Sequence, residues 1–157
     1  MSKALHKGID IKLRIIGRVK EQSFVQDPKV KDRVELMKPL PYEVLPIAMS
    51  GASFGIIGRP NTLPWKLSIP VKLFDYIAYG LPVFAFGPPR SELQSFIDKL
   101  NLGMYVPSTD PDRVANGLLE FIKSISCYDR KHILRVARFF DRKKWAKKLV
   151  EIVENLL

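Results

Sequence analysis

Apolar and polar residues alternate along this chain in short blocks, and the blocks predict strands and helices in turn. Ile11, Leu13 and Ile15 are separated by single polar residues, a period of two that is typical of a strand, so a strand is predicted over 9–16. The run 53–57 is apolar on both faces, as in a parallel strand covered by helices on both sides. In all, strands are predicted at 9–16, 33–37, 53–57, 83–86 and 103–106.

Helical segments are predicted before, between and after these strands. Residues 1–7 indicate the end of a helix, and 42–50 predicts another that turns four apolar side chains inward. These four are Val44, Leu45, Ala48 and Met49. Ser91 and Gln94 form a capping-box pattern, which predicts a helix from 91 to about 100.

The last third of the chain is predicted to be mostly helical. Thr109 or Asp110 is the expected cap of a helix with Pro111 at its first position. Its predicted buried stripe comprises Val114, Leu118, Phe121 and Ile125. From 131 onward the pattern is helical again, and a final amphipathic helix is marked by Trp145, Leu149, Ile152, Val153 and Leu156.

The stretch 68–82 carries the most specific pattern. Ser68 is the expected N-cap, Pro70 suits the first turn, and Gly80 with Pro82 ends the helix. The residues expected to face a sheet are Val71, Phe74, Ile77 and Ala78, and those sharing another face are Lys72, Asp75 and Tyr79. A cation, an acid and a helix N-terminus near one spot suit a ligand that carries phosphate and hydroxyl groups.

Strict alternation of strands and helices predicts an α/β fold, with a Rossmann-like, mostly parallel sheet and helices on both faces. The 157 residues fit one domain over 1–157, with a basic helical C-terminal part over about 128–157. Ligands of such sheets bind outside the carboxyl ends of the strands. The candidate site is therefore the set of loops after residues 16, 37, 57 and 86.

The chain has a net charge of +10, from 26 basic and 16 acidic residues, and much of the excess lies between 130 and 148. A solvated face of two helices is the preferred interpretation. An anionic membrane surface is the next, and nucleic acid is disfavoured because no nucleic-acid motif is present. One cysteine and two histidines offer no disulfide and no metal site. No signal peptide or membrane-spanning run is recognisable, so a cytoplasmic location is predicted.

The run Pro70-Val-Lys-Leu-Phe-Asp-Tyr-Ile-Ala-Tyr-Gly-Leu-Pro-Val83 resembles the nucleotide-sugar-binding, C-terminal half of GT-B glycosyltransferases, especially the glycosyltransferase 4 (group 1) type. Weaker similarity extends over about 4–157, including Ser91-Glu92 and Trp145 with the Leu-rich end. The resemblance implies a GT-B half-domain that binds a nucleotide-diphosphate sugar for transfer to an acceptor hydroxyl. It implies no obligatory metal and no cofactor besides that substrate.

The resemblance also implies a donor site. Asp75 matches the acid that binds the ribose hydroxyls, and a carboxylate can accept both hydroxyls of a diol. Residues matching those beside the base are Leu36, Met37, Lys38 and Pro39. Candidates for the phosphate or sugar are Ser68, Lys72, Arg59 and Glu92. No catalytic residue is assigned, because the family's base usually comes from the other half.

Each of these residues also has a purely structural interpretation. Asp75 and Lys72 could simply form a solvated pair on one helix, and Arg59 could be a solvated loop residue. Glu92 is favourable at a helix N-terminus through the helix dipole alone.

The chain departs from the family pattern at two points. Leu67 stands where the family often has its first glutamate. The first strand, its phosphate-binding loop and the acceptor-binding half have no counterpart, so this chain alone is expected to be inactive and to need a separate or missing N-terminal half. The alternative is a non-catalytic Rossmann-like binding or interaction module. A dinucleotide-binding enzyme is disfavoured, since no Gly-x-Gly-x-x-Gly follows a strand.

Overall fold

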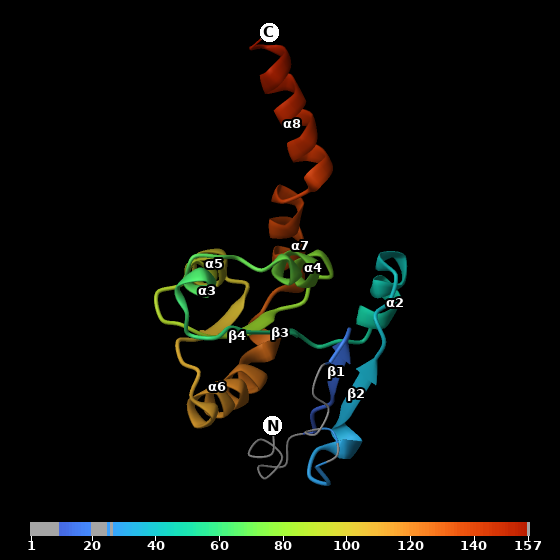
Figure 1. The fold of residues 1–157 in the computed structure, drawn as a ribbon, viewed down its shortest axis with the longest axis vertical. Coiled ribbons are helices and arrows are strands. Elements are labelled where there is room, and N and C mark those ends of the chain that lie inside the picture. The colour runs from blue at the N-terminus through green and yellow to red at the C-terminus, as the bar shows by residue number, and fades with distance from the viewer. Residues whose placement is uncertain (1–9, 20–24, 26, 157) are drawn as a thin grey trace.

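The computed structural model describes residues 10–19, 25 and 27–156 (Figure 1). Within this part of the chain the strands are β1 (Leu13–Ile16), β2 (Val34–Met37), β3 (Gly55–Gly58), β4 (Val83–Phe86) and β5 (Gly103–Val106). All paired strands are parallel, and they form two sheets, one of order β1-β2 and one of order β3-β4-β5. The predicted α/β class with parallel strands is confirmed. The helix end predicted over 1–7 lies outside the described residues.

Helical segments lie between the strands, and the chain after β5 is helical. The α-helices are α2 (Leu45–Met49), α3 (Leu63–Lys66), α4 (Val71–Ala78), α5 (Glu92–Leu100), α6 (Pro111–Ser124), α7 (Arg130–Phe139) and α8 (Arg142–Glu154). Short 3-10 turns are η2 (Lys31–Arg33), η3 (Tyr42–Val44) and η4 (Ile125–Cys127). Helices α4 and α5 lie on one side of the three-stranded sheet and α6 on the other (Figure 1), so the predicted helix cover on both faces is confirmed.

The central strand β4 is buried on both faces because its side chains alternate between two apolar layers. Val83 and Ala85 belong to the core that α4, α5 and α7 complete with Leu73, Ile97 and Ile133 among others. Phe84 points the other way, where its ring lies 5.6 Å from that of Phe121 on α6. A strand buried on both sides needs a continuous apolar run rather than an alternating one. The sequence 83–86 has that run, and its predicted bounds are those observed.

Two glycines are needed by this packing. A Cβ atom on Gly103 would lie 1.9 Å from the carbonyl oxygen of Val83, so β5 can pair with β4 only if residue 103 has no side chain. Gly80 has a φ of +65°, a left-handed conformation that ends the helical stretch after α4 at the predicted position.

Helix α4 begins later than predicted, and its buried face is different. Its N-cap is Pro70 and no side chain caps it, so the prediction that Ser68 is the N-cap is wrong. Leu73 and Ile77 are fully buried, whereas Val71 is 59% exposed. Ala78 is exposed as well. The predicted inward positions Ile77 and Phe74 are confirmed, since Ile77 is fully buried and Phe74 packs against the core, but Val71 and Ala78 are wrong and Leu73 was missed.

Two other helical segments also differ from the prediction. The segment 42–50 is a 3-10 turn followed by the short helix α2, and Val44 is exposed while Ala48 is buried. In α6 the cap is Asp110, as one of the two alternatives predicted, and Phe121 is buried as expected. The other fully enclosed positions of α6 are Gly117 and Leu119 rather than Val114 and Leu118.

Candidate functional site

The candidate site lies where the parallel strands end. A helix that connects two parallel strands must run back antiparallel to them, so the N-terminus of α4 lies at the carboxyl edge of β3 and β4. The loop 59–70 before α4, the turn 87–91 before α5 and the loop 38–41 after β2 all occupy carboxyl ends of strands. These are the loops that the sequence predicts to surround a ligand.

Asp75 lies in the second turn of α4 and faces the segment that follows β2. The hydroxyl of Tyr42 donates to Asp75 Oδ1 at 3.5 Å, so residues 33 positions apart meet at this point. Tyr79, the C-cap residue of α4, lies one turn after Asp75. Burial raises the pKa of Tyr79, and the neighbouring Tyr42 and Asp75 raise it further. Asp75 forms no ion pair with Lys72 within the part of the chain that the structure describes.

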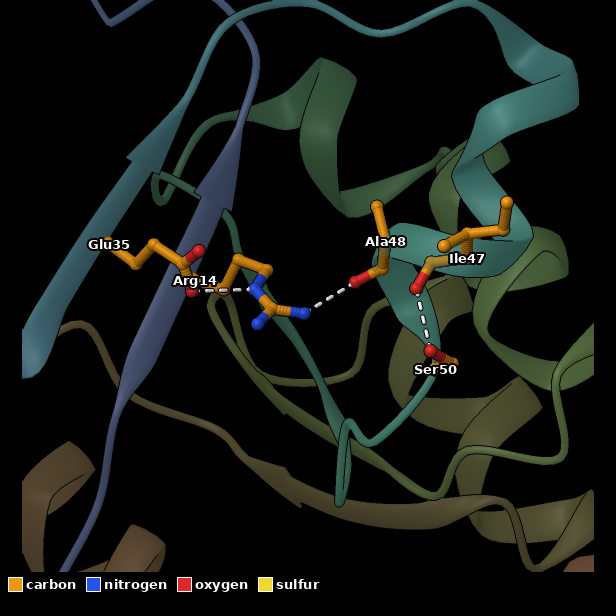
Figure 2. Close-up of polar contacts among 5 residues, drawn as sticks. All are labelled: Arg14, Glu35, Ile47, Ala48 and Ser50. Atoms are coloured by element: carbon orange, nitrogen blue, oxygen red, sulfur yellow. Dashed lines mark hydrogen bonds and ion pairs between the residues drawn. The ribbon is translucent and has the colours of Figure 1, made fainter.

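Arg14 fixes the segment that carries Tyr42. Figure 2 shows its guanidinium between β2 and α2, with Nε donating to Glu35 Oε2 at 2.8 Å and Nη1 donating to the Ala48 carbonyl at 2.6 Å. The Ala48 carbonyl is one of the terminal carbonyls of α2 that have no partner inside the helix. Arg14 therefore ties α2 to the β1-β2 sheet, and the loop with Tyr42 spans these two anchored elements.

The four residues predicted beside a nucleotide base lie at the end of β2 and directly after it. Leu36 pairs with Ile15 and Met37 with Ile16 in the parallel register, and both are partly buried. Lys38 and Pro39 are exposed. The same segment continues through Pro41 to Tyr42, and so it leads directly to the contact with Asp75.

Arg59 follows β3 and is held in a partly buried position. Its guanidinium carbon stacks 3.9 Å from the centroid of the Trp65 ring. Its Nε is buried and has no hydrogen-bond partner among the described residues. Burial lowers the pKa of Arg59 from its usual value, because a charged group loses hydration there. An uncompensated buried donor of this kind is relieved by an anionic or polar ligand.

A hydroxyl chain fixes the turn beside Arg59. Ser91 Oγ donates to the Tyr105 hydroxyl at 3.0 Å, which in turn donates to the Pro88 carbonyl at 2.8 Å. Ser91 also accepts from the Gln94 N–H, so the predicted N-cap of α5 is confirmed. A Cβ atom on Gly87 would lie 2.9 Å from Arg59 Cβ and 3.0 Å from the Tyr105 hydroxyl. The β4–α5 turn and the start of the β3–α4 loop are therefore packed tightly together.

The remaining predicted residues are spread along this edge. Ser68 lies in the β3–α4 loop, where its Oγ is buried without a hydrogen-bond partner among the described residues. Lys72 is exposed in the first turn of α4, and Glu92 is exposed as the first residue of α5.

Two residues that the sequence did not single out take part in this arrangement. Tyr42 reaches Asp75 across the loop after β2, and Trp65 covers the Arg59 guanidinium. Trp65 lies in the short helix α3, within a segment that the sequence predicts to be a loop rich in turn residues, and an exposed aromatic residue in such a segment is the signal that could have indicated it. The pairing of Tyr42 with Asp75 is long-range and has no local signal.

The chain matches no protein-family model, and no curated protein matches it either. Among the described residues, none of the helices has the length and apolar character needed to cross a bilayer.

Proposed function

We propose that this domain binds a nucleotide-diphosphate sugar at the carboxyl edge of its strands and serves as the donor domain of a metal-independent glycosyltransferase. The main support for the proposal is the position of Asp75 on α4, where it contacts Tyr42 in the segment that follows Leu36–Pro39. A carboxylate in this position offers two acceptor oxygens to a ribose diol, and the adjacent Tyr42 hydroxyl can donate or accept a further bond.

Residues of the β3–α4 loop support the phosphate end of the same ligand. Arg59 stacks on Trp65 with its Nε lacking a partner among the described residues, and Ser68 Oγ is buried nearby in sequence without one. Lys72 adds a solvent-exposed cation in the first turn of α4. Anionic oxygens of a diphosphate would supply the acceptors that these donors lack.

Transfer itself requires more than this domain. Sugar transfer needs the acceptor to be aligned with the donor and water to be excluded, which a cleft between two halves provides. We therefore expect catalysis only in a complex with an N-terminal acceptor-binding half, in the cytoplasm. A non-catalytic interaction module is the second candidate, and the exposed apolar face of α8 favours it.

A nucleotide panel tests the proposal. Thermal-shift titration of the purified chain with UDP, GDP and ADP, each up to about 5 mM, should raise Tm with one of them, because ligand that binds only the folded state stabilises it. Inorganic pyrophosphate at the same concentration is the control for simple anion binding. An absence of any nucleotide-specific rise would contradict the donor-domain function.

A further inference from the structure

The apolar stripe of α8 is exposed along its whole length. Every residue from Asp141 to Leu156 is exposed, and Leu149 and Leu156 retain 62% and 80% of their accessible surface. Figure 1 shows α8 projecting from α7 away from both sheets. Among the described residues, nothing covers this helix.

The charges of α8 are ordered around that stripe. At roughly 100° per residue, the apolar side chains fill an arc of about 160°. They are Trp145, Ala146, Leu149, Val150, Ile152, Val153 and Leu156. Lys148 borders one edge of the arc, Lys143 and Glu154 border the other, Arg142 lies within the arc at the first turn, and Glu151 lies on the opposite side of the helix. A lysine therefore flanks each edge of the apolar face, Glu151 points away from it, and Glu154 near the C-terminal end is the one acid of α8 beside it.

Two aromatic side chains, Phe139 and Trp145, lie close together at the junction of α7 and α8. The Trp145 indole N–H donates to the Phe139 carbonyl at 2.6 Å, and the Phe139 ring is 65% exposed. The ammonium groups of Lys144 and Lys148 lie 5.8 Å and 5.3 Å from the Phe139 and Trp145 ring centroids respectively. Exposed aromatic rings beside lysines are typical of helices that lie in the headgroup region of a bilayer.

Helix α7 extends the positive surface. It buries Ile133 and Val136 against the core, while Arg135 and Arg138 remain exposed. From 130 to 148 there are nine basic residues and one acid, which are Arg130, Lys131, Arg135, Arg138, Arg142, Lys143, Lys144, Lys147 and Lys148 against Asp141. A surface with this charge is complementary to an anionic bilayer.

We propose that α8 binds the surface of an anionic lipid bilayer, with its apolar arc inserted between the headgroups and its flanking lysines on the lipid phosphates. An arc of about 160° is broader than the narrow seam of a helix pair and matches the flat boundary of a membrane. The proposal is independent of the nucleotide site.

Vesicle binding tests it, and the two tryptophans allow a clean readout. In a Trp65→Phe variant Trp145 is the only tryptophan, so the selectively excited tryptophan emission should shift to the blue when vesicles containing phosphatidylglycerol are added. The protein should float with these vesicles and not with phosphatidylcholine alone. Raising the salt from about 0.1 M to 1 M shortens the Debye length from about 10 Å to 3 Å and should reduce binding about tenfold or more.

Two further variants test whether the apolar face of α8 binds lipid or a protein. Leu149→Glu combined with Ile152→Glu should abolish flotation without lowering Tm, because these side chains contact no core. Glu151→Gln, on the opposite side, should bind at least as well as the unmodified chain. Equal binding to neutral vesicles, or full binding by the double variant, would overturn the proposal. So would stripe-dependent dimerisation in sedimentation without vesicle binding, which would assign the face to a protein.

Discussion

At the scale of single residues, Asp75 is the side chain on which a nucleotide site depends. Its contact with Tyr42 is long, at 3.5 Å, and such a hydrogen bond contributes little to folding. The carboxylate therefore retains acceptor capacity, and Tyr42 orients it without neutralising it. If Asp75 binds ligand, its removal should lower nucleotide affinity while changing the free energy of unfolding little, so measuring both quantities distinguishes a binding role from a structural one.

Removing the Tyr42 hydroxyl should weaken the site modestly. Because one neutral hydrogen bond contributes about 0.5–1.5 kcal/mol, Tyr42→Phe is expected to lower affinity for the cognate nucleoside diphosphate about threefold, measured by calorimetry. Tyr79→Phe is the matched control, since the Tyr79 hydroxyl has no hydrogen bond to Asp75 in the described structure. If both variants bind like the unmodified chain, Tyr42 has no role in orienting Asp75.

Arg59 and Trp65 offer a second check at the same scale. In a Trp145→Phe variant the remaining tryptophan is Trp65, which stacks on Arg59 at 3.9 Å. A diphosphate that draws the guanidinium towards its oxygens would alter this stacking, so the Trp65 emission should change along the same titration curve as calorimetry gives. An unchanged emission at nucleotide saturation would place Arg59 outside the site.

At the scale of elements, the sequence predicted those structures that depend on local pattern. The continuous apolar run 83–86 became β4 with the predicted bounds, and the Ser91 cap and Gly80 stop are where expected. The start of α4 was missed because Ser68 offers a capping hydroxyl, whereas Pro70 disfavours a helical conformation in the residue before it and is itself the N-cap, so that the helix begins at Val71. Two of the four residues predicted to face the sheet, Phe74 and Ile77, do so, whereas Leu73 was missed because the position of the sheet relative to α4 is set by tertiary packing.

The Arg14 bridge gives a prediction about an element. Arg14→Ala removes both the exposed pair with Glu35 and the hydrogen bond to the Ala48 carbonyl, so a loss of about 1–2 kcal/mol in the free energy of unfolding is expected. Arg33→Ala is the control, because the Arg33 side chain is 38% exposed against 41% for Arg14 and pairs with exposed Asp10. Urea denaturation that gives equal losses would show that the contact with Ala48 stabilises nothing.

At the scale of the whole molecule, the candidate site joins two sheets that the sequence pattern cannot place relative to each other. Tyr42 follows the β1-β2 sheet, and Asp75 belongs to the helix that packs on β3 and β4. Their meeting depends on tertiary packing, as does the stacking of Trp65 on Arg59. Sequence could therefore indicate Asp75 and the loops around it, but not the neighbours that define its environment.

Stability of the whole domain should fall in alkaline solution. Burial raises the pKa of Tyr105 above its usual 10.0, so above about pH 10 the folded state holds more protons than the unfolded state and stability decreases as pH rises. Tyr105→Phe loses the bond to the Pro88 carbonyl and should be about 1 kcal/mol less stable at neutral pH. Its decline above about pH 10 should nevertheless be shallower in denaturation curves. Parallel declines would contradict a raised Tyr105 pKa.

The central claim, a nucleoside diphosphate site built on Asp75, is tested most directly by calorimetric titration of the Asp75→Ala variant with the nucleotide that stabilises the unmodified chain. Asp98→Ala, which removes an exposed acid from α5, is the control. Loss of the carboxylate should weaken binding about tenfold or more, with Tm changed by only about 1–2 °C, while the control keeps its affinity. Unchanged affinity in Asp75→Ala, or an equal loss in both variants, would contradict the account.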